Sequence, residues 1–305
     1  MLNYEQIKNR PRILRSLTGL TLAAFEQLVK SFNRTCQQEL AHNDNQREQP
    51  RQRQRGGGRK ATLASNEDKL LFILFYFKLY PIQELLGFFF GLSQAQANYW
   101  LHTLTPILNQ ALGYEQQLPA RKTRDIEQVL AACPELEFIL DGTERPIQRP
   151  KDRQRQQDNY SGKKKRHTVK NNVISHKPTK KIKALSPTEP GKIHDKKLAE
   201  QEQYRFPAGS KLWKDTGFQG YEPDGVITYQ PKKKPKGGEL TAAEKEENQA
   251  IAKERIGVEH SIGGVKVFHI VRDIYRNHKQ GFADLIMETA CGLHNLRLDF
   301  PMVAA

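Results

Sequence analysis

The chain has 305 residues, of which 37% are hydrophobic, and its formal net charge is +15. This length suggests two domains, and so large a positive excess favours a polyanionic partner, most simply nucleic acid, over a merely soluble basic surface. The three cysteines, Cys36, Cys133 and Cys291, are far apart and form no CxxC pair. This argues against a zinc site or a disulfide framework and fits a reducing cytosol.

The N-terminal part predicts helices and then a linker. Residues 1–43 form a helical segment in which 16–32 have the spacing of an amphipathic helix, and the polar start is not a signal peptide. Residues 44–61 are basic and end in three glycines, so we expect a flexible linker that either contacts phosphates or is simply solvated. The apolar run LLFILFYF from Leu70 is too short for a membrane span, which needs about 20 residues, so no membrane association is expected.

Residues 62–112 have the pattern of a helix-turn-helix. A helix capped near Ser65 runs to about Leu79, a second begins near Pro81, and a third, capped by Ser93, follows a turn at Gly91. If the last of these is a recognition helix, the residues near its start read DNA bases: Gln94, Gln96, Ala97 and Tyr99. An ordinary helical hairpin is the alternative, and the Phe88-Phe89-Phe90 run is expected in the core.

Residues 113–134 are expected to be a linker with a short helix, and residues 135–300 an α/β domain with a mixed sheet. Strands are predicted in ELEFILDGT, KKKRHTVKNNVISHK, TKKIKALSPTE, SKLWKDTGF and GVITYQ, and a helix in HDKKLAEQEQ. The long helix LTAAEKEENQAIAKERIGVEHSI opens with a T-x-x-E capping box at Thr241.

Three carboxylates stand out in this domain. Asp141 and Asp215 each end a predicted strand, and ligands gather at the carboxyl ends of strands in open α/β sheets. Glu259 lies on the long helix in one stripe with Arg255, Ile262 and Lys266. Taken alone, Arg255 and Glu259 are more simply an i,i+4 ion pair worth about 0.2–0.5 kcal/mol.

Taken together, the three acids indicate a metal site. Packed in a cleft, they would raise one another's pKa, and a divalent cation would remove that penalty. Carboxylates suit Mg²⁺ or Mn²⁺, and two such ions can assist an in-line phosphoryl displacement. A basic protein with an acidic metal site is therefore expected to be a DNA nuclease.

The chain also resembles the DDE-type transposases of bacterial insertion sequences, in the group numbered five, which is related to Harbinger-type elements. The residues that carry the resemblance are DGTE at Asp141, GKIHD at Gly191, DTGFQG at Asp215, RIGVEHSIGGVK at Arg255 and CGLHNLR near Cys291. Residues 62–108 are similar to that group's helix-turn-helix. The resemblance implies an RNase H-like fold for the catalytic domain.

The resemblance also implies roles. Asp141, Asp215 and Glu259 would be the catalytic, metal-binding triad, while Arg255 and Lys266 would contact DNA phosphates. Ala252 stands where many relatives have a tyrosine, which bears on any hairpin mechanism. The basic run that contains Lys163, Lys164, Lys165 and Arg166 would line a DNA channel, the alternative being a solvated charge run. His194 and Asp195 are interpreted as helix-start residues, and His260 as no ligand.

The expected function is that of a transposase, which binds double-stranded DNA at its element's terminal inverted repeats, cleaves it with Mg²⁺ or Mn²⁺ and transfers the free 3′-hydroxyl to target DNA. It would use two metal ions per active site and no small-molecule cofactor. A homo-oligomeric synaptic complex in the bacterial cytoplasm, at the nucleoid, is expected. The alternatives are a domesticated nuclease, a DNA-binding regulator with a vestigial catalytic fold, and an RNA-directed nuclease.

Overall fold

The computed structural model describes residues 1–45, 61–235 and 237–301, with the side chains of residues 43–45 and 255–259 left out, so most of the predicted linker 44–61 lies outside the described residues. The chain divides into two compact units. The first comprises Met1–Leu118, Val267–Ile270 and Leu285–Ala305, and the second comprises Pro119–Lys266 and Val271–Asp284. No helix among the described residues is long and apolar enough to cross a bilayer.

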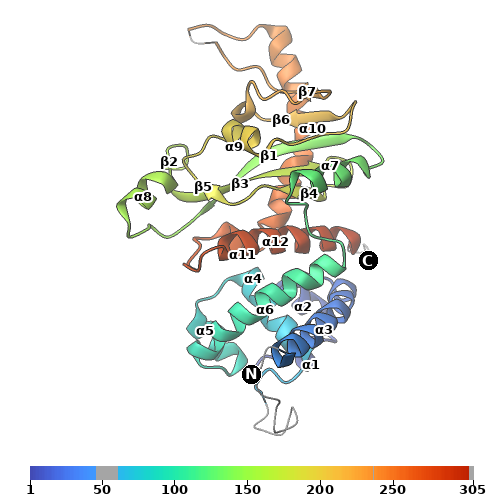
Figure 1. Cartoon of the computed structure of the whole chain (residues 1–305), viewed down its shortest axis with the longest axis vertical. Helices are drawn as coiled ribbons and strands as arrows, with labels where there is room; N and C mark the ends of the chain where they lie inside the picture. The colour runs from blue at the N-terminus through green and yellow to red at the C-terminus, as the bar shows by residue number, and fades with distance from the viewer. Residues whose placement is uncertain (46–60, 236, 302–305) are drawn as a thin grey trace. The chain divides into compact units, whose positions relative to one another are not determined.

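The first unit is built of helices (Figure 1). In chain order, its helices before the sheet are α1 (Tyr4–Ile7), α2 (Pro11–Thr18), α3 (Leu22–Asn45), α4 (Asn66–Leu79), α5 (Gln83–Phe90) and α6 (Gln94–Tyr114). Two helices come late in the sequence, α11 (His269–Arg272) and α12 (Phe282–Asp299). From Leu285 onward, α12 belongs to the first unit by its contacts, and the predicted catalytic domain of residues 135–300 stays a prediction.

Local signals explain where these helices begin and end. The predicted helix α4 is confirmed: the Ser65 side chain accepts a hydrogen bond from the Asp68 amide, and the helix is buried on nearly every face. The single helix expected over 16–32 is wrong. Gly19, with φ of 79°, ends α2 in the left-handed conformation that glycine adopts without strain, and α3 starts after a short turn.

The predicted helix–turn–helix is present as α5 and α6. Gly91, with φ of 66°, ends α5, and Ser93 forms a full capping box with Gln96 at the start of α6. The expectation that the three phenylalanines are core residues is wrong for two of them. Phe90 is buried, but Phe88 is 79% exposed and Phe89 43% exposed, because successive residues of a helix point in different directions.

The second unit is a mixed α/β domain, and the predicted fold class is confirmed. Its sheet has the strand order β2-β3-β1-β6-β7, with β4 and β5 also pairing with β3. The strands are β1 (Glu137–Pro146), β2 (Tyr160–Ser161), β3 (Arg166–His176), β4 (Ile182–Leu185), β5 (Glu189–Pro190), β6 (Lys211–Lys214) and β7 (Ile227–Tyr229). Its helices are α7 (Thr123–Ala131), α8 (Arg153–Asn159), α9 (Asp195–Glu202), the 3₁₀ turn η1 (Thr216–Phe218) and α10 (Ala242–Val265).

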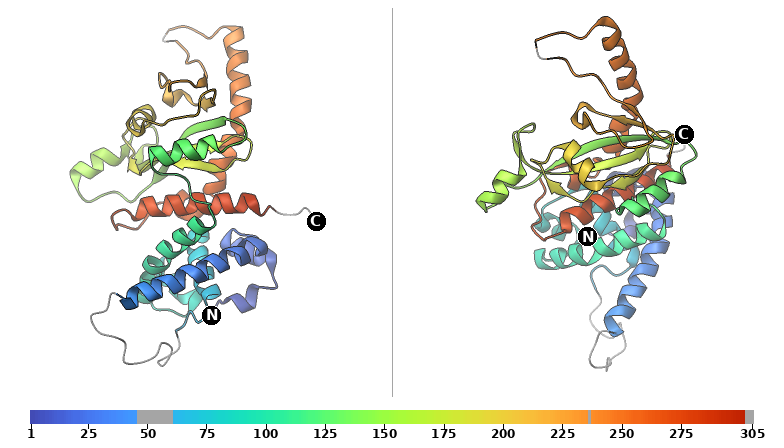
Figure 2. Two further views of the ribbon diagram at one scale, coloured as in Figure 1. Left: turned by 45° about the vertical axis from the view of Figure 1, so that its right-hand side comes forward. Right: turned by 45° about the horizontal axis from the view of Figure 1, so that its top comes forward.

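The central strand β1 has a different environment on each face. Phe138 and Leu140 pack in the core that also contains Ile126 of α7 and Ala199 of α9. Ile139 points the other way and packs with Trp213 of β6 and Ile251 of α10. The long helix α10 therefore covers the face opposite α7 and α9, as the two views in Figure 2 allow the reader to follow. Helix α7, expected in a linker, is part of this core.

Candidate active site

Asp141 and Asp215 lie side by side on neighbouring parallel strands. The β1–β6 ladder ends with the pair Leu140 and Lys214, and the two aspartates are the next residue of each strand segment. Asp215 keeps an extended backbone, with φ of −85° and ψ of 176°. Since side chains alternate along a strand, Asp141 shares the face of Ile139, which is the face covered by α10. The Asp215 carboxylate lies beside Gly217 and lines a hollow together with Asp195.

The expectation that Asp141 ends its strand is wrong in one respect. Strand β1 continues to Pro146, because its antiparallel pairing with β3 runs from Phe138 to Pro146. Only the parallel pairing with β6 stops beside Asp141. At Asp141, β1 therefore still pairs with β3 on one edge but no longer pairs with β6 on the other.

Backbone amides hold both aspartate side chains. The Gly142 amide donates to Asp141 Oδ1 at 2.9 Å, and the Gly217 amide donates to Asp215 Oδ1 at 2.8 Å. Asp215 is the N-cap of η1, so its side chain is tied to the turn that follows β6. In both cases one carboxylate oxygen is fixed by the backbone of the next residues.

The third predicted acid, Glu259, and its neighbour Arg255 fall within the bounds of α10, but their side chains lie outside the described residues. The helix itself is placed by Ile251, which packs with Ile139 and Trp213 on the face of β1 that Asp141 shares. The capping box predicted at Thr241 is confirmed. Whether Glu259 completes a triad stays a prediction.

Lys266, the C-cap of α10, is close enough to Asp141 to interact with it electrostatically. Burial lowers the pKa of Lys266, the nearby Lys164 lowers it further, and Asp141 and Glu144 oppose these effects. Lys266, the predicted phosphate contact, thus lies near Asp141. Because its ammonium group is partly desolvated, binding an anion there would be especially favourable.

Asp215 also lines a hollow of about 350 Å³. Its lining includes Lys163 from the predicted basic run, Lys233 from the segment before α10, and the acids Glu144, Asp195 and Asp215. Lys163, Lys164, Lys165 and Arg166 are all exposed around the β2–β3 connection. Positive side chains therefore surround an acidic centre, an arrangement suited to a polyanion that must approach carboxylates.

The sequence interpretation missed Asp195 as a member of this site. His194 is the N-cap of α9, as expected, but the Asp195 side chain turns to the sheet and accepts a hydrogen bond from Lys170 Nζ at 2.8 Å. Lys170 also lies 3.7 Å from Glu144. The signal was present in the GKIHD segment, where an acid at a helix start has a ready structural explanation.

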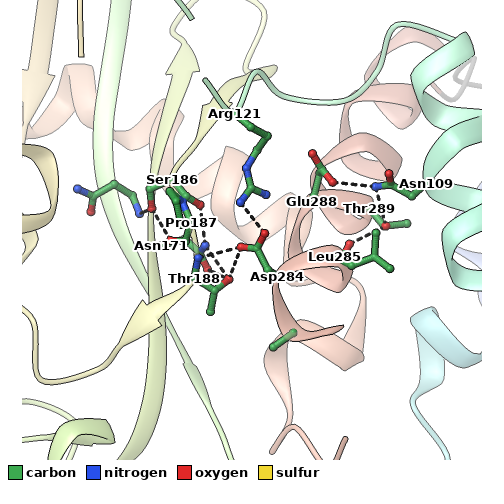
Figure 3. Close-up of polar contacts among 12 residues, drawn as sticks. Asn109, Arg121, Asn171, Ser186, Pro187, Thr188, Asp284, Leu285, Glu288 and Thr289 are labelled. Atoms are coloured by element: carbon green, nitrogen blue, oxygen red, sulfur yellow. Dashed lines mark hydrogen bonds and ion pairs between the residues drawn. The ribbon is translucent and has the colours of Figure 1, made fainter. Parts of the chain in front are cut away.

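Arg145 lies further along β1 than Asp141, and its side chain is on the same face of the strand. This nearly fully buried arginine donates to Asn171 Oδ1 at 2.9 Å, to Thr188 Oγ1 at 3.1 Å and to the Ala283 carbonyl at 3.0 Å. Asp284 accepts from the Thr188 amide and hydroxyl at 2.8 and 2.7 Å and from Arg121 (Figure 3). This buried network stiffens the sheet next to the candidate site.

The donors suit a hard divalent cation. Carboxylate oxygens are the ligands that Mg²⁺ and Mn²⁺ prefer, and Asp141 and Asp215 carry them at the ends of two paired strand segments. Among the side chains that the structure describes, no three His, Cys, Asp or Glu residues converge as a complete metal-binding group. Two of the three predicted ligands are thus placed together, and the third lies on a helix whose side chain there is not described.

In the helical unit, the predicted DNA-reading residues differ in their availability. Gln94 donates to Gln83, and the Gln96 side chain accepts from the Ser93 amide at 2.9 Å as part of the capping box. Ala97 is buried. Tyr99 is 62% exposed and contacts the Trp100 ring edge-on, so it is the freest of the predicted residues to meet another molecule.

Comparison with known proteins agrees with both regions. Residues 140–295 match the family model described as DDE superfamily endonuclease, and residues 62–113 match the helix-turn-helix of DDE superfamily endonuclease. A probable transposase for insertion sequence element IS702 from Microchaete diplosiphon is 31% identical over 232 residues, which are 76% of this chain and 80% of that protein.

Among solved structures, the chain is similar to a piggyBac transposase in a synaptic complex with hairpin DNA. The TM-score is 0.42 at 11% identity, and the match covers 96% of this chain and 75% of that one. The family assignment depends instead on the sequence matches, which span the helix-turn-helix and the domain with the paired aspartates. The chain belongs to the DDE superfamily endonucleases and carries that family's helix-turn-helix DNA-binding domain.

Proposed function

We propose that this chain is a DNA transposase that binds the terminal inverted repeats of its own element, cleaves the DNA at each end and joins the new ends to target DNA. The observation that supports the proposal is the parallel register of β1 and β6, whose last pair, Leu140 and Lys214, immediately precedes Asp141 and Asp215. The family and the IS702 relative support the same interpretation.

Asp141, Asp215 and Glu259 would hold two Mg²⁺ or Mn²⁺ ions. Such ions make bound water acidic and offset the charge that develops on the phosphate. The backbone amides on Asp141 and Asp215 fix the direction of each carboxylate, so the ligands are set before substrate arrives. Lys266, which interacts with Asp141, and Lys163, which lines the hollow with Asp215, would bind DNA phosphates near the cleaved bond.

Two phosphoryl transfers follow at this site. In the first, a water oxygen bonds to phosphorus, the bond from phosphorus to the 3′-oxygen breaks, and the element is left with a 3′-hydroxyl. In the second, that hydroxyl attacks a phosphorus of target DNA and displaces a 3′-oxygen there. Neither step forms a covalent bond to the protein. Because two element ends must be joined to one target, a homo-oligomeric complex is part of the proposal.

A strand-transfer assay tests this function. The full chain is incubated with duplexes that carry the element's own ends, a supercoiled target and Mg²⁺ or Mn²⁺. We expect 3′-end cleavage and joined products from the wild type, and neither from Asp141→Asn or Asp215→Asn, while both variants still shift the end DNA in a gel. Cleavage without joining would indicate a domesticated nuclease. Binding without cleavage by the wild type would indicate a regulator, and either result would contradict the proposal.

A further inference from the structure

A carboxylate with no part in the proposed chemistry lies against the backbone of both catalytic segments. Asp195 is the first residue of α9, and its side chain is only 17% exposed. Its Oδ1 accepts from Lys170 Nζ at 2.8 Å, and its backbone carbonyl accepts from Asn172 Nδ2 at 3.1 Å. Both donors belong to β3, so the side chain and the backbone of Asp195 are tied to the strand next to β1.

The Asp195 carboxylate fills the space where two glycines lack a side chain. A Cβ on Gly142 would lie 2.8 Å from Asp195 Cγ, and a Cβ on Gly217 would lie 3.0 Å from Asp195 Oδ2. Carbon atoms do not approach so closely without displacing something. Neither glycine has a positive φ, so the constraint is one of space: Asp195 sets it at Gly142, and Asp215 Oδ1 together with Asp195 sets it at Gly217.

These glycines closely follow the proposed metal ligands in sequence. Gly142 is next to Asp141, and Gly217 is two residues after Asp215, whose own Oδ1 lies 2.8 Å from the same Cβ position. One side chain therefore touches the backbone that carries both aspartates. Its contacts lie on the α9 side of β1, opposite the face that Asp141 shares with α10.

The Asp195 carboxylate forms a buried ion pair. Lys170 is 6% exposed and lies between Asp195, at 2.8 Å, and Glu144, at 3.7 Å. Glu144 in turn accepts from the Thr168 hydroxyl at 2.9 Å. Removing one member of so buried a group leaves an uncompensated charge, so the arrangement resists displacement.

We propose that Asp195 is a positioning residue, whose carboxylate, held by Lys170, sets the separation of the ends of β1 and β6 and so the separation of Asp141 and Asp215. This rests on the proposed function only for the role of the two aspartates. Gly142 and Gly217 have no side chain, and the space this leaves is occupied by the Asp195 carboxylate.

A double-mutant cycle tests the proposal. The full-length wild type, Gly142→Ala, Asp195→Ala and the double variant are compared by thermal unfolding without metal and by single-turnover cleavage of end DNA over a range of Mg²⁺ concentrations. Gly113→Ala is the control for an added methyl group, since a Cβ there meets only Leu118, at 3.5 Å. Asp195→Asn keeps the shape of the side chain and removes its charge.

We expect Gly142→Ala to lower Tm, to slow cleavage by roughly tenfold or more and to raise the Mg²⁺ concentration needed for half-maximal rate. Adding Asp195→Ala to Gly142→Ala should recover at least part of the lost rate and of the Mg²⁺ shift, because the methyl group then has room. Asp195→Asn keeps the side-chain volume but weakens the pairing of Lys170, so it should lower Tm and shift the Mg²⁺ midpoint less than Gly142→Ala does. Gly113→Ala should cleave at the wild-type rate.

Two results would overturn the proposal. If the Tm shifts of Gly142→Ala and Asp195→Ala simply add and their fold-changes in Mg²⁺ midpoint simply multiply, the two residues are independent and Asp195 does not set the separation. If Asp195→Asn is as inactive as Asp141→Asn, Asp195 takes part in the chemistry itself. A wild type that does not cleave would instead refute the proposed function, and the thermal cycle would still decide whether Asp195 and Gly142 interact.

Discussion

Asp141 and Asp215 each follow directly on a member of the last paired position of the parallel β1–β6 ladder, Leu140 and Lys214. Two ionised carboxylates repel each other when such positions bring them close together. In the absence of a cation this placement costs free energy, and a divalent metal turns it into a binding site. The proposed chemistry depends on this pair of aspartates.

Glu259 is predicted to be the third ligand on α10. Glu259→Gln should lower the single-turnover cleavage rate by about 10³-fold or more, the scale of several kcal/mol of transition-state stabilisation, while DNA affinity stays within a few-fold. The matched control is Glu254→Gln on the same helix, where an exposed carboxylate pairs with Lys177 at 2.6 Å. That change should leave cleavage unaltered and cost at most about 1 kcal/mol of stability. Equal loss in both variants would contradict the assignment of Glu259.

The β2–β3 connection is predicted to bind DNA phosphates. Replacing Lys163, Lys164 and Lys165 by glutamine should weaken binding to any DNA sequence and reduce the slope of log K against log salt by about 2–3, close to one unit for each phosphate that the variant no longer neutralises. The measurement is fluorescence anisotropy between low and moderate salt. The control is the same triple change at Lys180, Lys181 and Lys183, at the other end of β3. An unchanged slope in the first variant would show that these lysines are only a solvated surface.

Tyr99 is predicted to contact the element ends from the start of α6. Tyr99→Ala should weaken binding to end DNA by about 5- to 100-fold, with little change for unrelated DNA, because a base contact is worth about 1–3 kcal/mol. Tyr114→Ala, on the same helix, is the control: its hydroxyl bonds to Gln38 at 2.7 Å within the helical unit. That variant should lose stability and keep its preference for the ends. A Tyr99→Ala variant that prefers the ends as strongly as the wild type would refute this interpretation of the helix.

Features that depend on residues close together in the chain could be predicted from the sequence, whereas features that depend on distant residues could not. The strand at residues 135–143 and the caps at Ser65, Ser93 and Thr241 were predictable, because hydrophobic period and capping chemistry are local properties. Asp195 was not, because its role arises from packing against Gly142, which lies far from it in the chain. For the same reason, no local signal shows that the C-terminal part of α12 belongs to the helical unit, or that Phe88 points to solvent.

His176 predicts a pH dependence of stability. Its ring is buried, and burial lowers its pKa below the usual value near 6.5, while contact with the Glu135 carbonyl partly opposes the shift. Between the lowered pKa and 6.5, the unfolded chain binds the proton and the folded chain does not, so stability falls as pH falls through and below 6.5. Thermal unfolding from pH 7.5 to 5 should show a steeper loss for the wild type than for His176→Gln. Parallel curves would mean that His176 does not titrate differently in the two states.

The most direct test of the central claim is to locate the metal. Crystals of the full chain soaked in Mn²⁺ should show anomalous scattering within about 2.2 Å of a carboxylate oxygen of Asp141 and of Asp215, on the face of β1 that α10 covers. The same soak of Asp141→Asn crystals should lose or weaken that peak. Manganese bound only elsewhere in wild-type crystals, with both aspartates ordered and unliganded, would contradict the account.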